Sequence, residues 1–432
     1  MKTIGIGLLG FGTVGAGVVE GLQRQDATLA ARLGLGFALR RIADLDLERD
    51  RGVAVDRSLL TRDAAAVVND PAVDVVVELI GGCGAAQQLI LQALALGKPV
   101  VTANKALLAA HGAEIFQAAE ARQTPVYFEA SVGGGIPIIK ALREGLVANN
   151  IRSIYGILNG TCNYILTRME QEQAPFDAAL RAAQAAGYAE AEPSLDIDGH
   201  DTAHKAVILA ALAYGCPVPL SAASVEGIRG LAMEDLGNAL EMGYRIKLLG
   251  IVKLGPAGVG VRVQPTLVPR AHLLAAVSGV FNAIQVDGDL AGQTLYYGRG
   301  AGRAATASAV LSDLADVARD LAAGQRRMAP VHAAAGRTLQ LQPADDIAVR
   351  CYLRLTLLDK PGMLARVAQV LGKHGISIAS VMQKEARAGQ HVPVVIVTHQ
   401  AAEHQFRSAL ALIDRMEIIG APTVRLRIED FE

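Results

Sequence analysis

The sequence predicts an α/β protein of three units: an N-terminal doubly wound parallel sheet, a central α+β unit and a C-terminal βαββαβ unit. A length of 432 residues exceeds that of one ordinary domain. Strand and helix patterns alternate from residue 3 to about residue 102, which is typical of βαβ units in a parallel sheet. Residues 350–428 follow the order strand, helix, strand, strand, helix, strand, and this order defines a ferredoxin-like topology.

Composition excludes several classes of partner. The chain has 41 basic and 42 acidic residues and no Trp, so neither nucleic acid nor a membrane surface is expected as a partner. No apolar run approaches the roughly 20 residues that span a bilayer, and the apolar N-terminus lacks the features of a signal peptide. Four cysteines lie far apart without metal-binding spacing, so we expect reduced thiols in a cytoplasmic protein.

The N-terminal unit is predicted to span residues 1–130. A buried strand over residues 3–9 is followed at once by Gly-Phe-Gly-Thr-Val-Gly and then by a helix over residues 16–25. Further strands are expected at 37–43 and 73–79, a helix at 87–96 that ends at Gly97, and another strand from Pro99.

The glycine-rich motif predicts a dinucleotide site, because it lies between a strand and a helix as in Rossmann-type units. Gly10 would allow the tight turn, Gly12 would let the backbone approach a pyrophosphate, and Gly15 would let the helix pack closely. The N-terminus of the helix would bind the phosphates. A simple glycine-rich turn is the alternative interpretation. The predicted cofactor loop consists of Gly10, Phe11, Gly12, Thr13, Val14 and Gly15.

Asp44 ends the second predicted strand, where an acidic residue would accept a hydrogen bond from the ribose 2′-hydroxyl of NAD. Its interval from the glycines exceeds the usual ~20 residues. Arg40, Arg41 and Arg49 are close enough in sequence to bind the 2′-phosphate of NADP instead. NAD and NADP therefore both stay open, with NAD favoured.

The central unit is predicted to span residues 131–335. Strands are expected at 154–158, 247–252, 259–263 and 283–286, and an apolar helix at 206–214. A helix at 306–321 is expected to return to the N-terminal unit. Residues 340–346, which are polar and contain Pro343, are predicted to be a linker to the third unit at 348–432.

A cluster of acidic residues precedes the apolar helix. Asp201 and Lys205 are four residues apart and would share one face of a helix. Such pairs are usually solvent-exposed, but the residues that follow are apolar on every side, so this helix is expected to be buried. A buried, paired lysine is a candidate acid or base. A calcium site involving Asp196 and Asp198 is rejected, because the glycine and closing glutamate of an EF-hand loop are missing.

Four long motifs, in this order, are NKALLA, EASVGGGIP, GILNGTCNYIL and GYAEAEPSLDIDGHDTAHK. Together they resemble homoserine dehydrogenases, which oxidise L-homoserine to L-aspartate 4-semialdehyde with a nicotinamide cofactor. The resemblance extends to about residue 340. It implies that Lys205 is the catalytic acid, that Asp201 orients it and that Lys105 lies beside nicotinamide and substrate. It also implies a set of substrate-binding residues: Asn159, Gly160, Thr161, Glu190 and Asp196.

The same resemblance adds cofactor and cation residues. Residues 298–308 are similar to the family's loop near the cofactor, which implies roles for Gly300 and Gly302 beside Gly187. Ala305 stands where the family usually has a stiffening proline, and Leu45 stands where many members have an arginine, which favours NAD. The loop after residue 128 resembles a monovalent-cation loop, although a glycine-rich hinge is compatible with it. Na⁺ would be held by a Glu129 carboxylate oxygen and by the carbonyls of Val132, Gly134 and Ile136.

The opening of the third unit, strand–Asp-Lys-Pro-Gly–helix, resembles an ACT domain, a regulatory module that usually binds amino acids. Asp359 and Gly362 would contact the effector, for which L-threonine is the leading candidate. Truncation near Asp345 would then leave an active dehydrogenase without regulation. A role in subunit assembly is the alternative, and the family implies a homodimer or homotetramer.

The sequence therefore predicts a homoserine dehydrogenase of threonine, methionine and isoleucine biosynthesis. Two other classes stay open. One is a different semialdehyde or hydroxy-acid dehydrogenase on the same scaffold, and the other is a nucleotide- and amino-acid-sensing module without turnover. The Asp201/Lys205 pair speaks against the sensor, because binding alone does not need a buried acid–base lysine.

Overall fold

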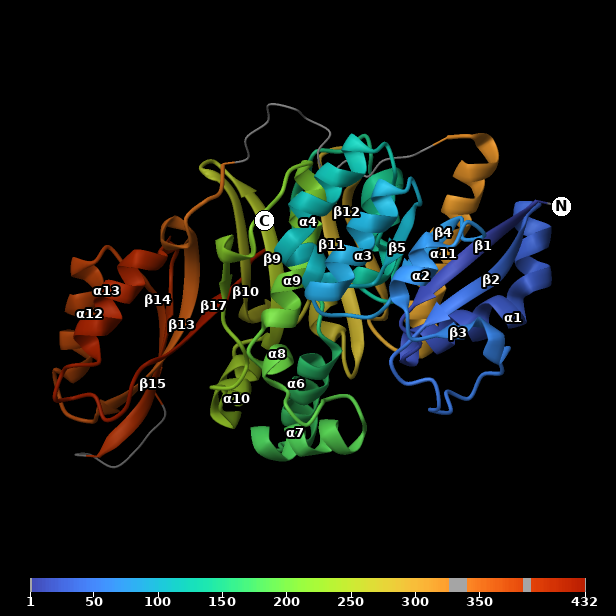
Figure 1. Cartoon of the computed structure of the whole chain (residues 1–432). Coiled ribbons are helices and arrows are strands. Elements are labelled where there is room, and N and C mark those ends of the chain that lie inside the picture. Colours follow the sequence, from blue (N-terminus) through green and yellow to red (C-terminus); the bar gives the residue numbers. More distant parts are fainter. Residues whose placement is uncertain (1, 326–339, 384–389, 432) are drawn as a thin grey trace.

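The computed structural model describes residues 2–325, 340–383 and 390–431, which form three units in a row (Figure 1). The N-terminal unit is built on a six-stranded parallel sheet with strand order β3-β2-β1-β4-β5-β6. Its strands are β1 (Thr3–Leu9), β2 (Gly36–Ala43), β3 (Leu60–Thr61), β4 (Val75–Glu78), β5 (Val100–Thr102) and β6 (Val126–Tyr127). Its helices are α1 (Thr13–Leu33), α2 (Ala64–Asn69), α3 (Gly84–Ala95) and α4 (Lys105–Ala121).

Both faces of this sheet are covered. In β4, Val76 packs toward the core beneath α2, α3 and α4, whereas Val75 and Val77 pack with α1 and with α11 (Arg303–Ala323), which returns from the central unit. Burial on both faces explains the continuous valine run of this strand. Helix α1 is longer than the sequence pattern predicted, and it ends where Gly34 adopts the left-handed conformation with φ 68°.

The central and C-terminal units share one sheet, whose order is β12-β11-β7-β9-β10-β17-β13-β15-β14. Two short strands join it at the side, β8 on β10 and β16 on β13. The central strands are β7 (Ile151–Ile157), β8 (Ala223–Val225), β9 (Tyr244–Gly255), β10 (Gly258–Pro269), β11 (Phe281–Gly288) and β12 (Gly292–Arg299). The central helices before α11 are α5 (Ile138–Lys140), α6 (Gly160–Glu172), α7 (Phe176–Ala185), α8 (Ser194–Ile197), α9 (His200–Tyr214) and α10 (Met233–Glu241).

Strand β10 continues beyond Val263, the last residue of the predicted strand, and runs through Pro265. Its neighbour β8 pairs with Val261–Val263, and its neighbour β17 begins to pair at Thr266. Pro265 thus falls between two partners on that edge, where the ladder needs no N–H donor. This arrangement lets a proline lie inside a long strand.

The C-terminal unit has the predicted βαββαβ order, with one additional short strand. Its elements are β13 (Ala348–Leu358), α12 (Met363–Lys373), β14 (Ile378–Gln383), β15 (His391–Thr398), β16 (Ala401–Ala402), α13 (Glu403–Ile413) and β17 (Val424–Ile428). Alternate residues of β13 face opposite cores: Leu353 packs beneath α12 and α13, and Tyr352 packs with the central unit. Among the described helices, none is both long and apolar enough to cross a membrane.

The predicted linker does not separate the C-terminal unit from the rest. Leu341 forms a parallel bridge with Val259 at the start of β10, and Gln342 donates its backbone N–H to the Val259 carbonyl at 3.0 Å. Farther along the same strand, β17 pairs with Thr266 and Leu267. Backbone groups that would otherwise need water as a partner find one at this edge, so the end of the linker becomes part of the sheet.

Candidate active site

The N-termini of two helices meet at the centre of the molecule. Helix α4 begins with Lys105 directly after β5, and Asn104 caps this helix by accepting the N–H of Leu107 at 3.1 Å. Helix α9 begins at His200 after Gly199, whose φ of 89° gives the chain its sharp turn. Because α4 and α9 pack against each other, Lys105 is brought to the first turn of α9.

Asp201, on that first turn, binds two lysines and an amide at once. Its Oδ2 accepts from the Lys205 ammonium at 2.7 Å and from the Asn159 amide at 2.9 Å, and its Oδ1 lies 3.3 Å from the Lys105 ammonium. The Asp201/Lys205 contact was predicted from helical spacing, whereas the contact between Lys105 and Asp201 was not. Lys205 also donates to the Leu158 carbonyl at 2.6 Å, so two of its three donors are used and one is left for a ligand.

Charge, rather than exposure to water, keeps Asp201 ionised. Burial alone would raise the pKa of this carboxyl, but the ammonium groups of Lys205 and Lys105, with hydrogen bonds from Lys205 and Asn159, hold the pKa well below its usual range. If either Lys205 or Lys105 is removed, Asp201 is still paired with the other lysine. The neighbouring His204 is half-buried, and burial lowers its pKa, so it stays neutral at neutral pH.

Asp196, which lies in α8, differs from Asp201 because its pKa is raised rather than lowered. Its Oδ1 accepts the second N–H of the Asn159 amide at 2.7 Å. Burial raises the pKa of Asp196, with the nearby Asp201 adding to the rise and the Asn159 hydrogen bond opposing it. Asn159 thus joins the two carboxylates, and its own Oδ1 caps α6 by accepting the N–H of Cys162 at 2.8 Å. Among the described residues no cation forms an ion pair with Asp196, so this carboxylate is suited to bind a ligand's ammonium group.

The other predicted substrate-binding residues, Gly160, Thr161 and Glu190, differ from one another in burial and in their contacts. Gly160 opens α6, where a Cβ would lie 2.7 Å from the Val280 carbonyl oxygen. The hydroxyl of Thr161 donates to the Tyr188 carbonyl at 2.7 Å. Glu190 is exposed, and its backbone carbonyl accepts from Gln184 at 3.1 Å. The structure therefore brings together Asn159, Asp196, Asp201 and both lysines, whereas Glu190 is exposed.

Two buried residues that the sequence analysis did not single out hold Lys105 in place. Glu78 ends β4, and its Oε2 accepts from the Thr102 hydroxyl at 2.6 Å. The Thr102 hydroxyl oxygen accepts the backbone N–H of Asn104 at 3.0 Å, and the Asn104 amide donates to Gly82 at 2.7 Å. The signal was available as a buried acidic residue at the carboxyl end of a parallel strand, the edge where such sheets bind ligands.

The glycine-rich loop has the predicted geometry at its three glycines. Gly10 has φ 94°, and a Cβ there would lie 2.6 Å from the Leu79 carbonyl oxygen. A Cβ on Gly15 would lie 2.2 Å from the Gly10 carbonyl oxygen, so no larger residue fits where α1 packs on the loop. A Cβ on Gly12 would meet no described atom within 4 Å. The loop is therefore closely packed against the protein at Gly10 and Gly15, whereas open space faces Gly12.

Asp44 lies beside this loop but is already engaged by the protein. Its Oδ2 accepts the Phe11 N–H at 2.6 Å, and its Oδ1 accepts the Asp46 N–H at 2.9 Å. The arginine that reaches Asp44 is Arg51, at 3.1 Å, and not one of the three nearer in sequence. Arg51 also donates to the carbonyls of Phe11, Arg49 and Asp46. Residues 45–50 bend the chain back, so that Arg51 reaches Asp44. The expectation that Arg40, Arg41 or Arg49 could bind a 2′-phosphate stays a prediction.

Apart from Gly187, the remaining cofactor and cation residues lie in two loops that pack together, the first over residues 129–136 and the second over residues 298–302. The Gly135 N–H donates to the Arg299 carbonyl at 3.0 Å, and a Cβ on Gly134 would lie 2.5 Å from the Gly300 carbonyl oxygen. Gly302 precedes α11 with φ 120°, and Ala305 follows in the first turn of that helix. Gly187, with φ 72°, lies instead at the end of α7, just before Tyr188.

Glu129 is buried at the start of the 129–136 loop and is bonded to the backbone of α5. Its two carboxylate oxygens accept the N–H groups of Ile139 and Lys140, each at 2.9 Å. Burial raises the pKa of Glu129, and these two N–H groups oppose the rise. Val132 is fully buried, and the Ile136 carbonyl accepts from Ile138 at 2.8 Å. Among the described residues, no cluster of three or more His, Cys, Asp or Glu side chains could hold a metal ion.

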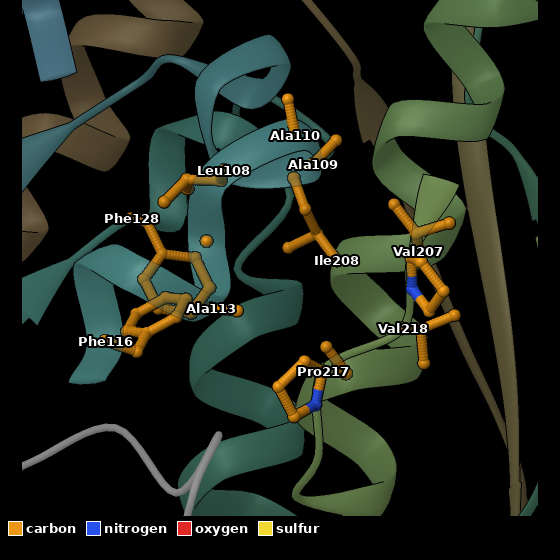
Figure 2. A pocket seen from close by; sticks show the side chains of 13 residues that line it. Leu108, Ala109, Ala110, Ala113, Phe116, Phe128, Val207, Ile208, Pro217 and Val218 are labelled. Atoms are coloured by element: carbon orange, nitrogen blue, oxygen red, sulfur yellow. The ribbon is translucent and has the colours of Figure 1, made fainter. Parts of the chain in front are cut away.

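An apolar cavity of about 190 Å³ lies farther along the same helix pair (Figure 2). Leu108 and Phe116 of α4 face Val207 and Ile208 of α9 across it, and Pro217 and Val218 close one end. Its lining contains no charged group. The cavity is therefore separate from the chemistry at the helix N-termini.

The residues predicted to bind an effector form an exposed turn of the C-terminal unit. Gly362 has φ 86° and precedes α12. The Asp359 carboxylate accepts from Gln383 at 3.4 Å. The residues of this turn lie far along the chain from the Asp201 cluster and contribute nothing to it.

Comparison with protein families matches three segments of the chain. Residues 137–315 match homoserine dehydrogenase, and residues 10–129 match the NAD-binding domain of homoserine dehydrogenase. Residues 352–417 match the ACT domain. The three matches fall on the three units of the fold.

Individual relatives agree with these matches. The homoserine dehydrogenase of Neisseria gonorrhoeae is 44% identical over 432 residues, and the alignment covers 99% of each chain. The crystal structure of a homoserine dehydrogenase from Thiobacillus denitrificans is 45% identical with a TM-score of 0.94, covering 100% of this chain and 99% of that one. A hyperthermophilic archaeal homoserine dehydrogenase mutant in complex with NADPH is 27% identical with a TM-score of 0.63, covering 73% of this chain and 98% of that one.

Proposed function

We propose that this chain, which belongs to the homoserine dehydrogenase family and is an NAD(P)-dependent oxidoreductase, interconverts L-homoserine and L-aspartate 4-semialdehyde. The observation that carries the proposal is the Asp201 cluster, in which one buried carboxylate holds two lysines from different units. In this proposal Lys205 is the acid, the glycine-rich loop binds the cofactor and Asp196 binds the amino group of the substrate.

Asp196 is proposed to bind the ammonium group of homoserine, with Asn159 fixing the orientation of the carboxylate and Glu190 adding charge at the rim. Support comes from the position of Asp196, which is partly buried and accepts from Asn159 at 2.7 Å. Gly160 and Thr161 start α6 beside it. Burial makes the Asp196 carboxylate costly unless a cation joins it, which a substrate ammonium would do.

Lys205 is proposed to move the proton. When bound, the nicotinamide accepts or donates the hydride. In the reductive direction the Lys205 ammonium would give a proton to the aldehyde oxygen, and in the oxidative direction the amine would take the proton of the homoserine hydroxyl. Asp201 keeps the ammonium oriented through the 2.7 Å contact. Lys105, which lies 3.3 Å from the other carboxylate oxygen of Asp201, is proposed to contact substrate and nicotinamide.

The described residues fit a dinucleotide. Open space faces Gly12, and no described side chain caps α1, so its first N–H groups are available for a phosphate. We favour NAD over NADP, because Asp44 repels a 2′-phosphate and Arg51 is 7% exposed and committed to protein oxygens. Gly300 and Gly302 would approach the cofactor from the second loop. Gly187, at the end of α7, would contact it from the substrate side.

Three further roles belong to the same proposal. Na⁺ would bind Glu129 and the carbonyls of its loop, since a buried carboxylate with raised pKa gains from a nearby cation. The ACT domain would bind an amino acid, for which threonine is our candidate, at the turn of Asp359 and Gly362. We further propose a homodimer or homotetramer in the cytoplasm, serving threonine, methionine and isoleucine biosynthesis.

The decisive experiment mixes purified full-length protein with L-homoserine and either oxidised cofactor, and follows the absorbance of reduced nicotinamide. We expect turnover, with a higher kcat/KM for NAD than for NADP, and faster turnover in sodium than in choline chloride. L-serine, one methylene shorter, is the matched control and should react far more slowly. No absorbance change with either cofactor from neutral to alkaline pH would refute the proposal.

A further inference from the structure

A segment of the central unit, residues 226–235, lies between the C-terminal unit and the proposed substrate site. It leaves the sheet after β8, passes beneath α8 and enters α10. The C-terminal unit holds it near both ends, and its middle contacts α8. Each of these three contacts involves backbone or charged groups.

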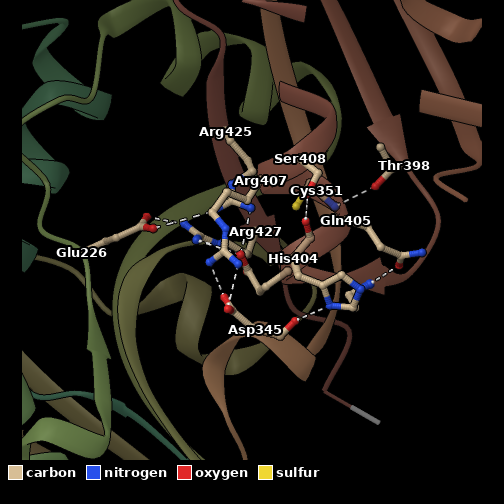
Figure 3. A network of polar contacts seen from close by, with 12 residues as sticks. Glu226, Asp345, Cys351, Thr398, His404, Gln405, Arg407, Ser408, Arg425 and Arg427 are labelled. Carbon is tan, nitrogen blue, oxygen red and sulfur yellow. Dashed lines mark hydrogen bonds and ion pairs between the residues drawn. The ribbon is translucent and has the colours of Figure 1, made fainter. Parts of the chain in front are cut away.

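At the first end, Glu226 is bound by Arg427 of β17 (Figure 3). Arg427 is also bound to Glu403 of α13, with 2.9 Å between Nε and Oε1, and Arg425 reaches the same Glu403 at 2.8 Å. The Arg427 side chain is 5% exposed. Because Arg427 is tied to its own unit by Glu403, the position of Glu226 follows the position of β17 and α13.

At the second end, Asp235 of α10 is fully buried and bound by β13. Both carboxylate oxygens accept from Arg354, at 2.6 and 2.9 Å, and the Tyr352 hydroxyl donates to one of them at 2.9 Å. A bidentate arginine fixes orientation as well as distance. The segment therefore has two anchors on strands of the C-terminal unit.

The middle of the segment is pressed against α8. The Ile228 N–H donates to the Ile197 carbonyl at 2.8 Å. A Cβ on Gly227 would lie 2.1 Å from the same carbonyl oxygen, so the two backbones are in direct contact. Arg229 binds both oxygens of Asp198, at 2.8 and 3.0 Å, and the Ser194 hydroxyl at 3.0 Å.

Helix α8 consists of only four residues, and Asp196 is one of them. Its flanks are also held by the segment, because a Cβ on Gly199 would lie 3.3 Å from the Glu226 carbonyl oxygen. A short helix has few contacts of its own, so its position depends on its neighbours. The 226–235 segment is one of these neighbours, and the C-terminal unit binds it at Glu226 and Asp235.

We propose that the 226–235 segment sets the position of Asp196 according to the position of the C-terminal unit, and that Arg229 is a positioning residue for substrate binding. This inference rests on the proposed function, in which Asp196 binds the substrate ammonium. When β17 and β13 move, both ends of the segment move with them. The backbone contact between Gly227 and Ile197 then transmits this movement to α8. An effector bound to the ACT domain would then act mainly on the affinity for homoserine.

The test compares Glu226→Gln and Arg229→Gln with Asp345→Asn in the full-length protein. Asp345→Asn is the matched control, because it removes one carboxylate charge from a pair with Arg407, 2.7 Å away, without touching the segment. Measurements are the KM for homoserine and for NAD(P), kcat, the thermal midpoint, and amide hydrogen exchange in residues 193–201.

Both test variants should raise the KM for homoserine about 5- to 20-fold, within the usual range of coupling between sites, with little change in the KM for the cofactor. Exchange in residues 193–201 should become faster at an unchanged thermal midpoint, and the control should match wild type. Unchanged exchange, or an equal rise in both KM values, would overturn the inference. If wild type does not oxidise homoserine, the proposed function fails, whereas the exchange data still decide whether the segment holds α8.

Discussion

The N-terminal and C-terminal units are joined to the central unit in different ways. The N-terminal unit keeps its six-stranded sheet to itself and meets the central unit through helix packing and side chains, including the contact of Lys105 with Asp201. The C-terminal unit continues the central sheet through β17 and adds the buried Asp235/Arg354 pair. Side-chain contacts can open without cost to main-chain pairing, whereas a shared sheet cannot. The junction between the N-terminal and central units can therefore open to admit ligands. The junction between the central and C-terminal units is suited to couple the positions of these two units.

Of the changes that test the difference between the two junctions, truncation after Asp345 should have the largest effect on folding and activity. It removes β13 to β17, strips β10 of its partner at Thr266 and Leu267, and leaves Asp235 without Arg354. The truncation also exposes to water the apolar core residues of the central unit that pack with Tyr352, Leu426 and Ile428, so we expect little folded protein and no useful activity. Circular dichroism and the dehydrogenase assay would measure it. A folded, active product would restore the linker interpretation that the sequence suggested.

Lys205→Ala should lower kcat by about 10²- to 10⁴-fold, the usual contribution of general acid–base catalysis. Stability should change little, because Asp201 keeps Lys105 and Asn159 as partners. Lys205→Arg should be nearly as slow, since a guanidinium holds its proton too tightly. Steady-state kinetics with a thermal melt measures both. An arginine variant as fast as wild type would make Lys205 an electrostatic clamp only.

Arg354→Met should affect stability at the junction between the central and C-terminal units instead. It leaves the fully buried Asp235 without its cation, which costs about 3–5 kcal/mol of the free energy of unfolding. Arg366→Met is the control, because the pair of Arg366 with Glu417 is exposed and such pairs contribute about 0–1 kcal/mol. Urea unfolding measures both variants. Equal losses would mean that Arg354 acts as an ordinary surface arginine.

The smallest expected effect is a pH dependence at the substrate site. Since burial raises the pKa of Asp196, this carboxyl gains its proton at a pH where an ordinary aspartate is still ionised. As pH falls, kcat/KM for homoserine should decline earlier than an ordinary aspartate would allow, while Asp201, with its lowered pKa, stays ionised. Asp196→Asn should be slower and should lack this acidic limb. A pH profile of kcat/KM for both proteins decides, and identical profiles would exclude Asp196 as the titrating group.

Local patterns predicted much of the fold and part of the site. The glycine loop between β1 and α1 and the βαββαβ order of the C-terminal unit follow from turn chemistry and periodicity over short stretches. Asp201 and Lys205 meet because they are one helical turn apart. Two pairings were missed: Arg51 with Asp44, seven residues apart but brought together by the intervening loop, and β17 with β10, which lie more than 150 residues apart in the sequence.

The sequence by itself determined which residue types occupy each turn, strand and helix face, because steric limits and side-chain periodicity act within a few residues. The tertiary structure alone decided that Lys105 shares Asp201 with Lys205, since this contact depends on how α4 packs against α9. It also decided that the third unit is continuous with the second. An exposed strand edge accepts any partner with free backbone groups, and only the folded chain shows that β10 is paired with β17.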